Sequence, residues 1–281
     1  MFEIISKQSL AQSITRMEVY APHIARKCKP GQFIMLRVHE KGERIPLTIC
    51  TKDRDAGTIT LIIQEVGKTT HMLCALNEGD RILDLAGPFG RPTHIEKVGT
   101  VVAIGGGVGT AVLYHVLAGF REAGNYVISI LGARSESLVI LEDEIRSLSD
   151  EFILTTDDGT KGRKGFVSDA LKDLIAQGRQ IDQVVAIGPV PMMRVVSGIT
   201  KEHNIPTIVS LNPIMVDGTG MCGGCRVEIG GETRFACVDG PEFDGHAVNW
   251  DLLTKRLATY REAEQLEMHT CRLTGVPQPV K

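Results

Sequence analysis

Three cysteines lie close together around one glycine-rich stretch of the chain. Cys222 and Cys225 form a C-x2-C pair, and Cys237 follows after eleven intervening residues. Thiolates presented from a tight loop suit a soft metal centre, either zinc or an iron–sulfur cluster. Glycine allows such a loop because it reaches positive φ without a Cβ clash. The glycines around the pair are Gly218, Gly220, Gly223 and Gly224.

Asp217 supplies the fourth ligand that three cysteines lack. It stands five residues before Cys222. With cysteine in its place the pattern would read C-x4-C-x2-C…C, the plant-type spacing of a 2Fe–2S cluster. A structural zinc knuckle with the same Cys3Asp ligands is the alternative, since C-x2-C also opens zinc sites. The spacing favours the cluster, with Asp217, Cys222, Cys225 and Cys237 as ligands.

This loop resembles the one near the C-terminus of two related flavoprotein families. The electron-transfer subunit of dihydroorotate dehydrogenase carries four cysteines there. The small subunit of the NADH-dependent ferredoxin:NADP oxidoreductase, also called the sulfide dehydrogenase small subunit, carries an aspartate ligand in a loop much like M-V-D-G-T-G-M-C-G. Because Asp217 stands in that place, the chain is identified as a member of the second family.

The composition is that of an ordinary globular protein with two or three domains. The chain has 281 residues, 43% of them hydrophobic and 23% charged, with a net charge of −3. This balance gives no reason to expect nucleic acid or an anionic membrane as a partner. We expect no spanning helix and no signal peptide, because no apolar run approaches about 20 residues. Scattered cysteines favour a reducing cytoplasm; these are Cys28, Cys50, Cys74 and Cys271.

Residues 1–97 are predicted to form an antiparallel β barrel, because short strand-like runs alternate with turns. The stretch from Arg44 to Ile49, R-I-P-L-T-I, resembles the R-x-P-L-T flavin signature of the ferredoxin–NADP reductase superfamily. The resemblance assigns Arg44 to the flavin pyrophosphate, for which a guanidinium fork is suited. It places Pro46, Leu47 and Thr48 along the strand at the isoalloxazine. An edge strand interrupted by proline is the alternative interpretation.

A second stretch of this domain has the pattern of an anion site. Gly67, Lys68, Thr69 and Thr70 come just before an apolar helix start. Free N–H groups and the helix dipole favour phosphate at such a position. In the superfamily this segment caps the flavin diphosphate, and simple N-capping by a threonine is compatible with that role.

Residues 98–211 are predicted to form a parallel α/β domain, because longer apolar strands alternate with helices. The strand at 100–104 runs into G-G-G-V-G-T and then a helix, a turn that lets backbone approach a diphosphate. Thr110 stands where the strict G-x-G-x-x-G fingerprint needs glycine, and the pattern matches the G-G-G-x-G of ferredoxin–NADP reductase-like domains. The predicted contacts are Gly105, Gly106, Gly107, Gly109 and Thr110.

Three further loops of this domain are candidate cofactor contacts. Arg134 follows the second strand, where loops meet the adenosine ribose. It could bind a 2′-phosphate, which would imply NADP, but G-x-R also occurs in NAD-using members of the families that the chain resembles, so NAD is favoured. A solvated cap is the alternative role for this arginine. Asp157 and Asp158 begin D-D-G-T-K-G-R-K-G, which resembles a loop of the electron-transfer subunits and is otherwise a polar turn. A loop similar to the superfamily's nicotinamide loop C-G-P-x-x-M contains Gly188, Pro189 and Met192, with Ile187 in place of cysteine.

The remaining chain divides into a cluster-binding segment at 212–245 and a C-terminal helix and tail at 246–281. Residues 249–268 are predicted to form one amphipathic helix, with Trp250, Leu253, Leu257 and Tyr260 near helical spacing. Two roles are open for it, a cap on its own domain or a docking element for a partner subunit.

The resemblance implies an electron-transfer subunit containing FAD and a 2Fe–2S cluster and using NAD(H). Flavin exchanges electrons in pairs with a nicotinamide and singly with a cluster. Hydride transfer between the two needs positioning, so no catalytic acid or base is predicted. The resemblance also implies a large glutamate-synthase-like partner holding FAD and 4Fe–4S clusters, through which ferredoxin and NADP(H) react in electron bifurcation. The alternatives are the dihydroorotate dehydrogenase electron-transfer subunit and a non-redox zinc module.

Overall fold

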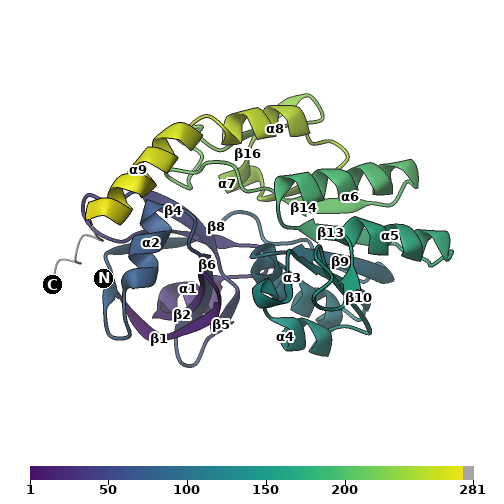
Figure 1. Ribbon diagram of the computed structural model, residues 1–281, viewed down its shortest axis with the longest axis horizontal. Helices are drawn as coiled ribbons and strands as arrows, with labels where there is room; N and C mark the ends of the chain where they lie inside the picture. Colours follow the sequence, from purple (N-terminus) through teal and green to yellow (C-terminus); the bar gives the residue numbers. More distant parts are fainter. Residues whose placement is uncertain (275–281) are drawn as a thin grey trace.

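The computed structural model describes residues 1–274, with side chains as far as Thr270. The tail at 275–281 and the side chain of Cys271 lie outside the described residues. Figure 1 shows a β-rich region formed by the first part of the chain beside a layered α/β region. No helix among the described residues is long and apolar enough to cross a membrane.

The N-terminal region is the predicted antiparallel barrel. Its five-stranded sheet has the order β5-β6-β2-β1-β7, and its three-stranded sheet the order β4-β3-β8. A core of buried aliphatic side chains, including Met17, Ile34 and Leu61, fills the space between them. Its elements are β1 (Phe2–Ala11), β2 (Ile14–Tyr20), α1 (Pro22–Lys27), β3 (Phe33–Arg37), β4 (Arg44–Thr48), β5 (Thr51–Asp53), β6 (Thr58–Gln64), α2 (Lys68–Ala75), β7 (Arg81–Ile82) and β8 (Asp84–Phe89).

The second region is the predicted α/β domain. Its sheet has the order β12-β11-β10-β9-β13-β14-β17, and every pair except β14–β17 is parallel. Its elements are β9 (Thr100–Gly106), α3 (Gly109–Glu122), β10 (Tyr126–Ala133), η1 (Glu136–Leu138), α4 (Glu142–Ser147), β11 (Glu151–Thr156), β12 (Arg163–Lys164), α5 (Val167–Ala176), β13 (Gln183–Ile187), α6 (Val190–Glu202) and β14 (Thr207–Ser210).

Helices cover both faces of this sheet, which explains why its strands are apolar without interruption. Figure 1 shows α5 and α6 on one side and α3 and α4 on the other. Alternate residues of β9 serve the two faces. Val102 and Ile104 pack in the core that contains α5 and α6. Val101 and Ala103 pack in the core that contains α3 and α4.

The C-terminal part returns to this sheet before it ends in helices. A hairpin of β15 (Arg226–Ile229) and β16 (Glu232–Phe235) leads through α7 (Ala236–Asp239) to β17 (Glu242–Asp244). Strand β17 adds antiparallel to β14, with Ser210 opposite Glu242. The cluster segment therefore leaves and rejoins one edge of the α/β sheet.

The helix expected at 249–268 is two helices, α8 (Trp250–Leu257) and α9 (Arg261–Thr274). Leu253 is buried, and Trp250 and Leu257 pack against the same core, so α8 lies on the α/β side. Tyr260 falls in the break and is 56% exposed. Beyond the break α9 runs to α2 of the barrel (Figure 1). The break occurs because the apolar stripe that holds α8 ends at Leu257.

Candidate functional site

The glycine turn after β9 and the loop after β13 meet at the carboxyl ends of two adjacent parallel strands. A Cβ built on Gly109 would lie 2.5 Å from the Ile187 carbonyl oxygen and 2.7 Å from Gly188 Cα. A Cβ on Gly106 would lie 2.5 Å from Met192 Sδ. Only glycine permits this approach. The structure thus brings together the predicted residues 105–110 and 188–192.

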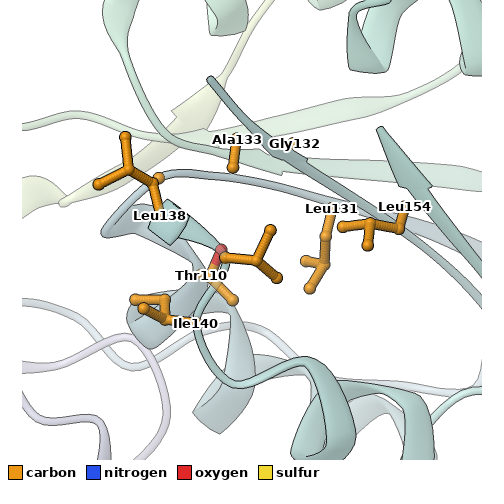
Figure 2. A pocket seen from close by; sticks show the side chains of 9 residues that line it. Thr110, Leu131, Gly132, Ala133, Leu138, Ile140 and Leu154 are labelled. Carbon is orange, nitrogen blue, oxygen red and sulfur yellow. The ribbon is translucent and has the colours of Figure 1, made fainter. Parts of the chain in front are cut away.

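A small hollow lies beneath the glycine turn, among the ends of β9, β10 and β11. Figure 2 shows Thr110 pointing toward it between Leu131 and Ile140. Its volume is about 10 Å³, which is room for about one water molecule. The hollow is therefore a packing gap that is too small to contain a nucleotide.

The loops after β10 and β11 are joined to each other at the same edge of the sheet. The backbone N–H of Asp157 donates to the Ala133 carbonyl at 3.0 Å, and that of Asp158 donates to the Arg134 carbonyl at 3.2 Å. Arg134 and both aspartates are exposed. Hydrogen bonds from Thr160 hold the pKa of the Asp158 carboxyl below its ordinary value. These three predicted residues form one polar rim beside the turn.

The predicted flavin strand β4 forms the edge of the three-stranded sheet. Pro46 lies opposite Met35 of β3, and Thr48 lies opposite Phe33. Proline fits an edge strand because it has no N–H to donate to a further strand. Arg44 is exposed at the start of the strand, while the Pro46, Leu47 and Thr48 positions are half-buried.

The second flavin stretch caps α2 and contacts the first. Thr70 Oγ1 accepts hydrogen bonds from the N–H groups of Val66 and Gly67, both at 3.0 Å. The N-cap residue is Gly67 and Thr70 is the third residue of the helix, so the threonine closes the helix start from inside rather than as the predicted N-cap. Thr69 Oγ1 donates to Glu43 Oε2 at 3.3 Å, next to Arg44. The two stretches therefore lie side by side. Lys68 Nζ pairs with Glu267 of α9 at 2.6 Å, so the C-terminal helix reaches this site.

The four predicted cluster ligands form two pairs. Asp217 accepts the N–H of Cys222 through Oδ2 at 2.7 Å, and the N–H of Thr219 through Oδ1 at 2.7 Å. Cys225 Sγ and Cys237 Sγ lie 3.2 Å apart. Within residues 1–274, no three histidine, cysteine or acidic side chains converge as ligands of a single ion. A two-iron cluster needs two protein ligands on each iron, a number that two such pairs match.

The hydrogen bonds of the loop also fit an iron–sulfur cluster. The backbone N–H of Gly224 donates to Cys222 Sγ at 3.4 Å, and that of Cys237 donates to Cys225 Sγ at 3.4 Å. Such bonds stabilise thiolates and tune a cluster. Backbone donors, Thr219 first, hold the pKa of the Asp217 carboxyl below its ordinary value. Burial raises the pKa of the Cys237 thiol to about 12, so metal binding has to release its proton.

The cluster loop packs directly against the flavin barrel. A Cβ built on Gly218 would lie 2.7 Å from Met35 Cγ and 3.2 Å from the Phe89 ring. Gly218 also has φ +79°, which favours glycine. Met35 shares a buried core with Cys225 and Cys237. Since Met35 pairs with Pro46, a single strand separates the cluster loop from the flavin strand.

Comparison with known proteins decides the family. Residues 1–94 match the model of the oxidoreductase FAD-binding domain, and residues 212–249 match the iron–sulfur cluster binding domain of dihydroorotate dehydrogenase B. A Thermotoga maritima protein described as a homolog of the dihydroorotate dehydrogenase B electron-transfer subunit is 47% identical over 94% of this chain and 93% of its own length. The chain belongs to the family of these electron-transfer subunits and their homologues. It is an oxidoreductase subunit with an FAD-binding and an iron–sulfur domain.

Other members and structures agree with this placement. The electron-transfer subunit of Desulforamulus reducens is 31% identical over 89% of this chain and 97% of its own length. A chain in the structure of an NADH-dependent reduced ferredoxin–NADP oxidoreductase is 45% identical, with a TM-score of 0.92, over 97% of this chain and 98% of that one. An Amycolatopsis cytochrome P450 reductase, 20% identical over 73% of this chain and 66% of its own, has a TM-score of 0.62 and shares the fold. The predicted fold class is confirmed.

Sequence reasoning missed two contacts of the cluster segment with the rest of this electron-transfer subunit, one made by Arg256 and one by Glu242 of the segment itself. Arg256 of α8 donates from Nη2 to the Gly224 carbonyl at 3.0 Å. Glu242 of β17 accepts from Thr93 Oγ1 at 2.7 Å, and burial raises the pKa of its carboxyl to about 7. Neither contact leaves a signal in the local sequence, because Arg256 lies 32 residues after Gly224 and Glu242 lies 149 residues after Thr93. Both depend on how α8 and β17 return to the domain.

Three cysteines outside the cluster loop have no chemical role in this arrangement. Cys28, Cys50 and Cys74 are free and buried in the cores. Burial raises the pKa of all three thiols, that of Cys50 to about 12. Buried thiols with raised pKa values are unreactive, so these residues act as small apolar side chains.

Proposed function

We propose that this chain is the electron-transfer subunit of a heterodimeric NADH-dependent ferredoxin:NADP oxidoreductase that bifurcates electrons. In this role it links NAD(H), FAD and a 2Fe–2S cluster. Bound flavin supplies the exchange between paired and single electrons. Support comes from 45% identity to a chain in the structure of such an oxidoreductase, whose description refers to flavin-based electron bifurcation.

The observation that carries the proposal is the contact between the cluster loop and the flavin barrel. Gly218 packs on Met35 and Phe89, and Met35 lies opposite Pro46 of the flavin strand. A cluster held by this loop would be a near neighbour of a flavin lying on β4. Such a fixed, close arrangement is what transfer between the two groups requires.

The proposed roles follow from the positions described above. Arg44 and the N-terminus of α2 bind the flavin diphosphate, and residues 46–48 lie along the flavin ring. The glycine turn binds the diphosphate of NAD(H), the polar rim binds the adenosine end, and residues 188–192 lie at the nicotinamide end. Asp217 and Cys222 hold one iron, and Cys225 and Cys237 hold the other.

The partner we propose is a larger glutamate-synthase-like flavoprotein with FAD and 4Fe–4S clusters. Through that subunit ferredoxin and NADP(H) would exchange electrons with this chain. Exposed apolar side chains next to the ligands support a protein contact here. Val216 is 52% exposed beside Asp217, Met221 is 88% exposed beside Cys222, and Val238 is 38% exposed beside Cys237.

A second candidate is the electron-transfer subunit of an NAD-dependent dihydroorotate dehydrogenase. The iron–sulfur domain model and relatives such as the Desulforamulus reducens subunit favour it. Asp217 argues against it, since the family resemblance gives that enzyme four cysteine ligands.

Anaerobic co-purification with the products of neighbouring genes tests the proposal. We expect two irons and one FAD on this chain, flavin reduction by NADH, and a large flavoprotein carrying further iron. A dihydroorotate dehydrogenase as the companion would establish the second candidate. Zinc without flavin, in a colourless protein, would overturn both.

The aspartate ligand has a separate test. Replacing a carboxylate by a thiolate changes both the donor atom and its hydrogen bonds, so Asp217→Cys should shift the cluster potential. An anaerobic redox titration followed by electron paramagnetic resonance measures it, with Met221→Leu as a change in the same loop that keeps every ligand. A potential unchanged in Asp217→Cys would remove Asp217 from the ligand set.

A further inference from the structure

Arg256 is the side chain of α8 that reaches into the ligand loop. Its Nη2 donates to the carbonyl oxygen of Gly224 at 3.0 Å. Gly224 stands between Cys222 and Cys225, and its own N–H donates to Cys222 Sγ. The guanidinium therefore holds the Gly224–Cys225 peptide, which lies between the proposed ligands Cys222 and Cys225.

A second donor of the same guanidinium has no partner. Arg256 Nε is buried and makes no hydrogen bond to any described residue. A buried donor without an acceptor costs roughly 1 to 3 kcal/mol, and more on a charged group. Such orphans call for an explanation, such as an ion or group that occupies the site when the protein is complete. The loop that Arg256 touches is the one proposed to hold a negatively charged cluster.

The position of Arg256 is fixed by the elements around α8. Asn249 caps the helix by accepting the Leu252 N–H at 3.0 Å, and its Nδ2 donates to Glu228 Oε1 of β15 at 2.8 Å. Asp251 pairs with Arg194 of α6 at 2.8 Å. These contacts connect α8 to the hairpin and to the α/β domain. The Arg256 guanidinium is therefore held beside the ligand loop rather than being free to move in solvent.

We propose that Arg256 is a positioning residue that fixes the Gly224–Cys225 peptide and raises the reduction potential of the cluster. The proposal rests on the proposed function, because it requires the cluster. An iron–sulfur cluster with four anionic ligands is negatively charged, and reduction adds one more negative charge. A fixed cation nearby stabilises the reduced form more than the oxidised form. Hydrogen bonding and charge around the ligands are known determinants of cluster potential.

Two substitutions distinguish the effect of the Arg256 charge from the effect of its planar set of hydrogen-bond donors. Arg256→Gln removes the charge, whereas Arg256→Lys keeps it and loses the planar fork. Lys255→Gln is the matched control, because it removes an exposed positive charge from the adjacent position of the same helix. Each protein is prepared as the anaerobic complex. Iron content and the midpoint potential from a redox titration followed by electron paramagnetic resonance are measured for each.

We expect a more negative midpoint potential in Arg256→Gln, a smaller change in Arg256→Lys, and the unmodified value in Lys255→Gln. Loss of iron from either Arg256 variant, with full iron in the control, also supports the anchoring of Gly224. Full iron and an unchanged potential in Arg256→Gln would overturn the proposal, as would equal shifts in Arg256→Gln and Lys255→Gln. Absence of iron from the unmodified complex would instead overturn the proposed function.

Discussion

The barrel contacts the rest of the described chain at several places, and two of these junctions differ in how closely they pack. Toward the cluster segment the contacts are tight: Thr93 bonds Glu242 at 2.7 Å, and the Arg91 N–H donates to the Gly240 carbonyl at 2.6 Å. Toward α3 and α4 the junction contains a cavity of about 210 Å³, lined by residues that include Arg16 and Tyr114. We call the junction toward the cluster segment the tight junction. We call the junction toward α3 and α4 the loose junction because it contains this cavity, although Ile14 and Ile62 of the barrel share a buried core with Leu113 of α3 there.

The largest loss of stability is expected for Gly31→Ala, a substitution at the tight junction. Gly31 has φ +81°, and a Cβ there would lie 2.3 Å from Thr93 Oγ1 and 3.0 Å from Glu242 Oε1. Gly31→Ala should cost roughly 3 to 5 kcal/mol, from backbone strain and overpacking together. Gly79→Ala is the control, since Gly79 has φ +84° with nothing within 4 Å of a Cβ. Urea denaturation followed by circular dichroism measures both, and equal losses would mean that the junction is not tight.

Glu242 gives the same junction a dependence on pH. Burial raises the pKa of its carboxyl to about 7 from an ordinary 4.5, so the folded state binds more protons than the unfolded state. The contribution of Glu242 to stability is therefore complete below pH 4.5 and is lost as pH rises to about 7, by roughly 3 kcal/mol in total. Glu242→Gln should remove this loss, whereas exposed Glu232→Gln should not. Denaturation midpoints at pH 5 and pH 8 measure it; parallel curves for Glu242→Gln and the unmodified chain would contradict a buried carboxyl.

His115, at the loose junction, should give stability the opposite dependence on pH. Its Nδ1 lies 3.2 Å from the Ile49 carbonyl oxygen, and burial lowers the pKa of the imidazole from 6.5. The folded state binds fewer protons, so this contribution is complete above pH 6.5 and is lost as pH falls below that value. His115→Gln keeps a donor for a hydrogen bond worth about 1 kcal/mol, so stability should change little at pH 8. Between pH 6.5 and pH 5 it should lose less stability than the unmodified chain; identical slopes would show that His115 does not titrate with unfolding.

The smallest change in stability is expected for Tyr114→Phe, at the cavity of the loose junction. The Tyr114 hydroxyl has no hydrogen-bond partner among the described residues and lies on the cavity. Tyr114→Phe should therefore change the free energy of unfolding by less than about 0.5 kcal/mol. Tyr126→Phe is the comparison, since the Tyr126 hydroxyl bonds Glu151 at 2.7 Å and its removal should cost about 1 kcal/mol. A loss of 2 kcal/mol or more for Tyr114→Phe, beyond the usual range for such sites, would mean that this junction is packed after all.

The local motifs were predictable because each lies within one turn or strand. The glycine turn at 105–110 and the strands around it follow from apolar runs and glycine spacing, and the predicted sheet and barrel are confirmed. The C-x2-C loop was visible for the same reason. The proposed roles of individual residues remain predictions, since proximity alone does not assign a ligand.

Contacts between distant segments were not predictable. Strand β17 has three residues and pairs with β14 more than thirty positions earlier, so no periodicity reveals it. Arg256 looks like a surface cation of an amphipathic helix until α8 is placed on the loop. The sequence does not reveal the break between α8 and α9, because Tyr260 continues the helical spacing of Leu253 and Leu257. Tertiary packing, rather than propensity, ends the first helix.

The edge pairing of β14 with β17 has a consequence for how this subunit can change. The Leu211 N–H donates to the Pro241 carbonyl at 2.9 Å, so the cluster segment begins and ends at adjacent positions. The entropic cost of closing a loop between such ends grows slowly with its length. A segment anchored at adjacent positions can vary in length and composition without altering how β14 pairs with the sheet, and the glycine turn after β9 lies two strands away from this edge. What limits such variation is the contact of Gly218 with Met35 and Phe89, rather than the sheet.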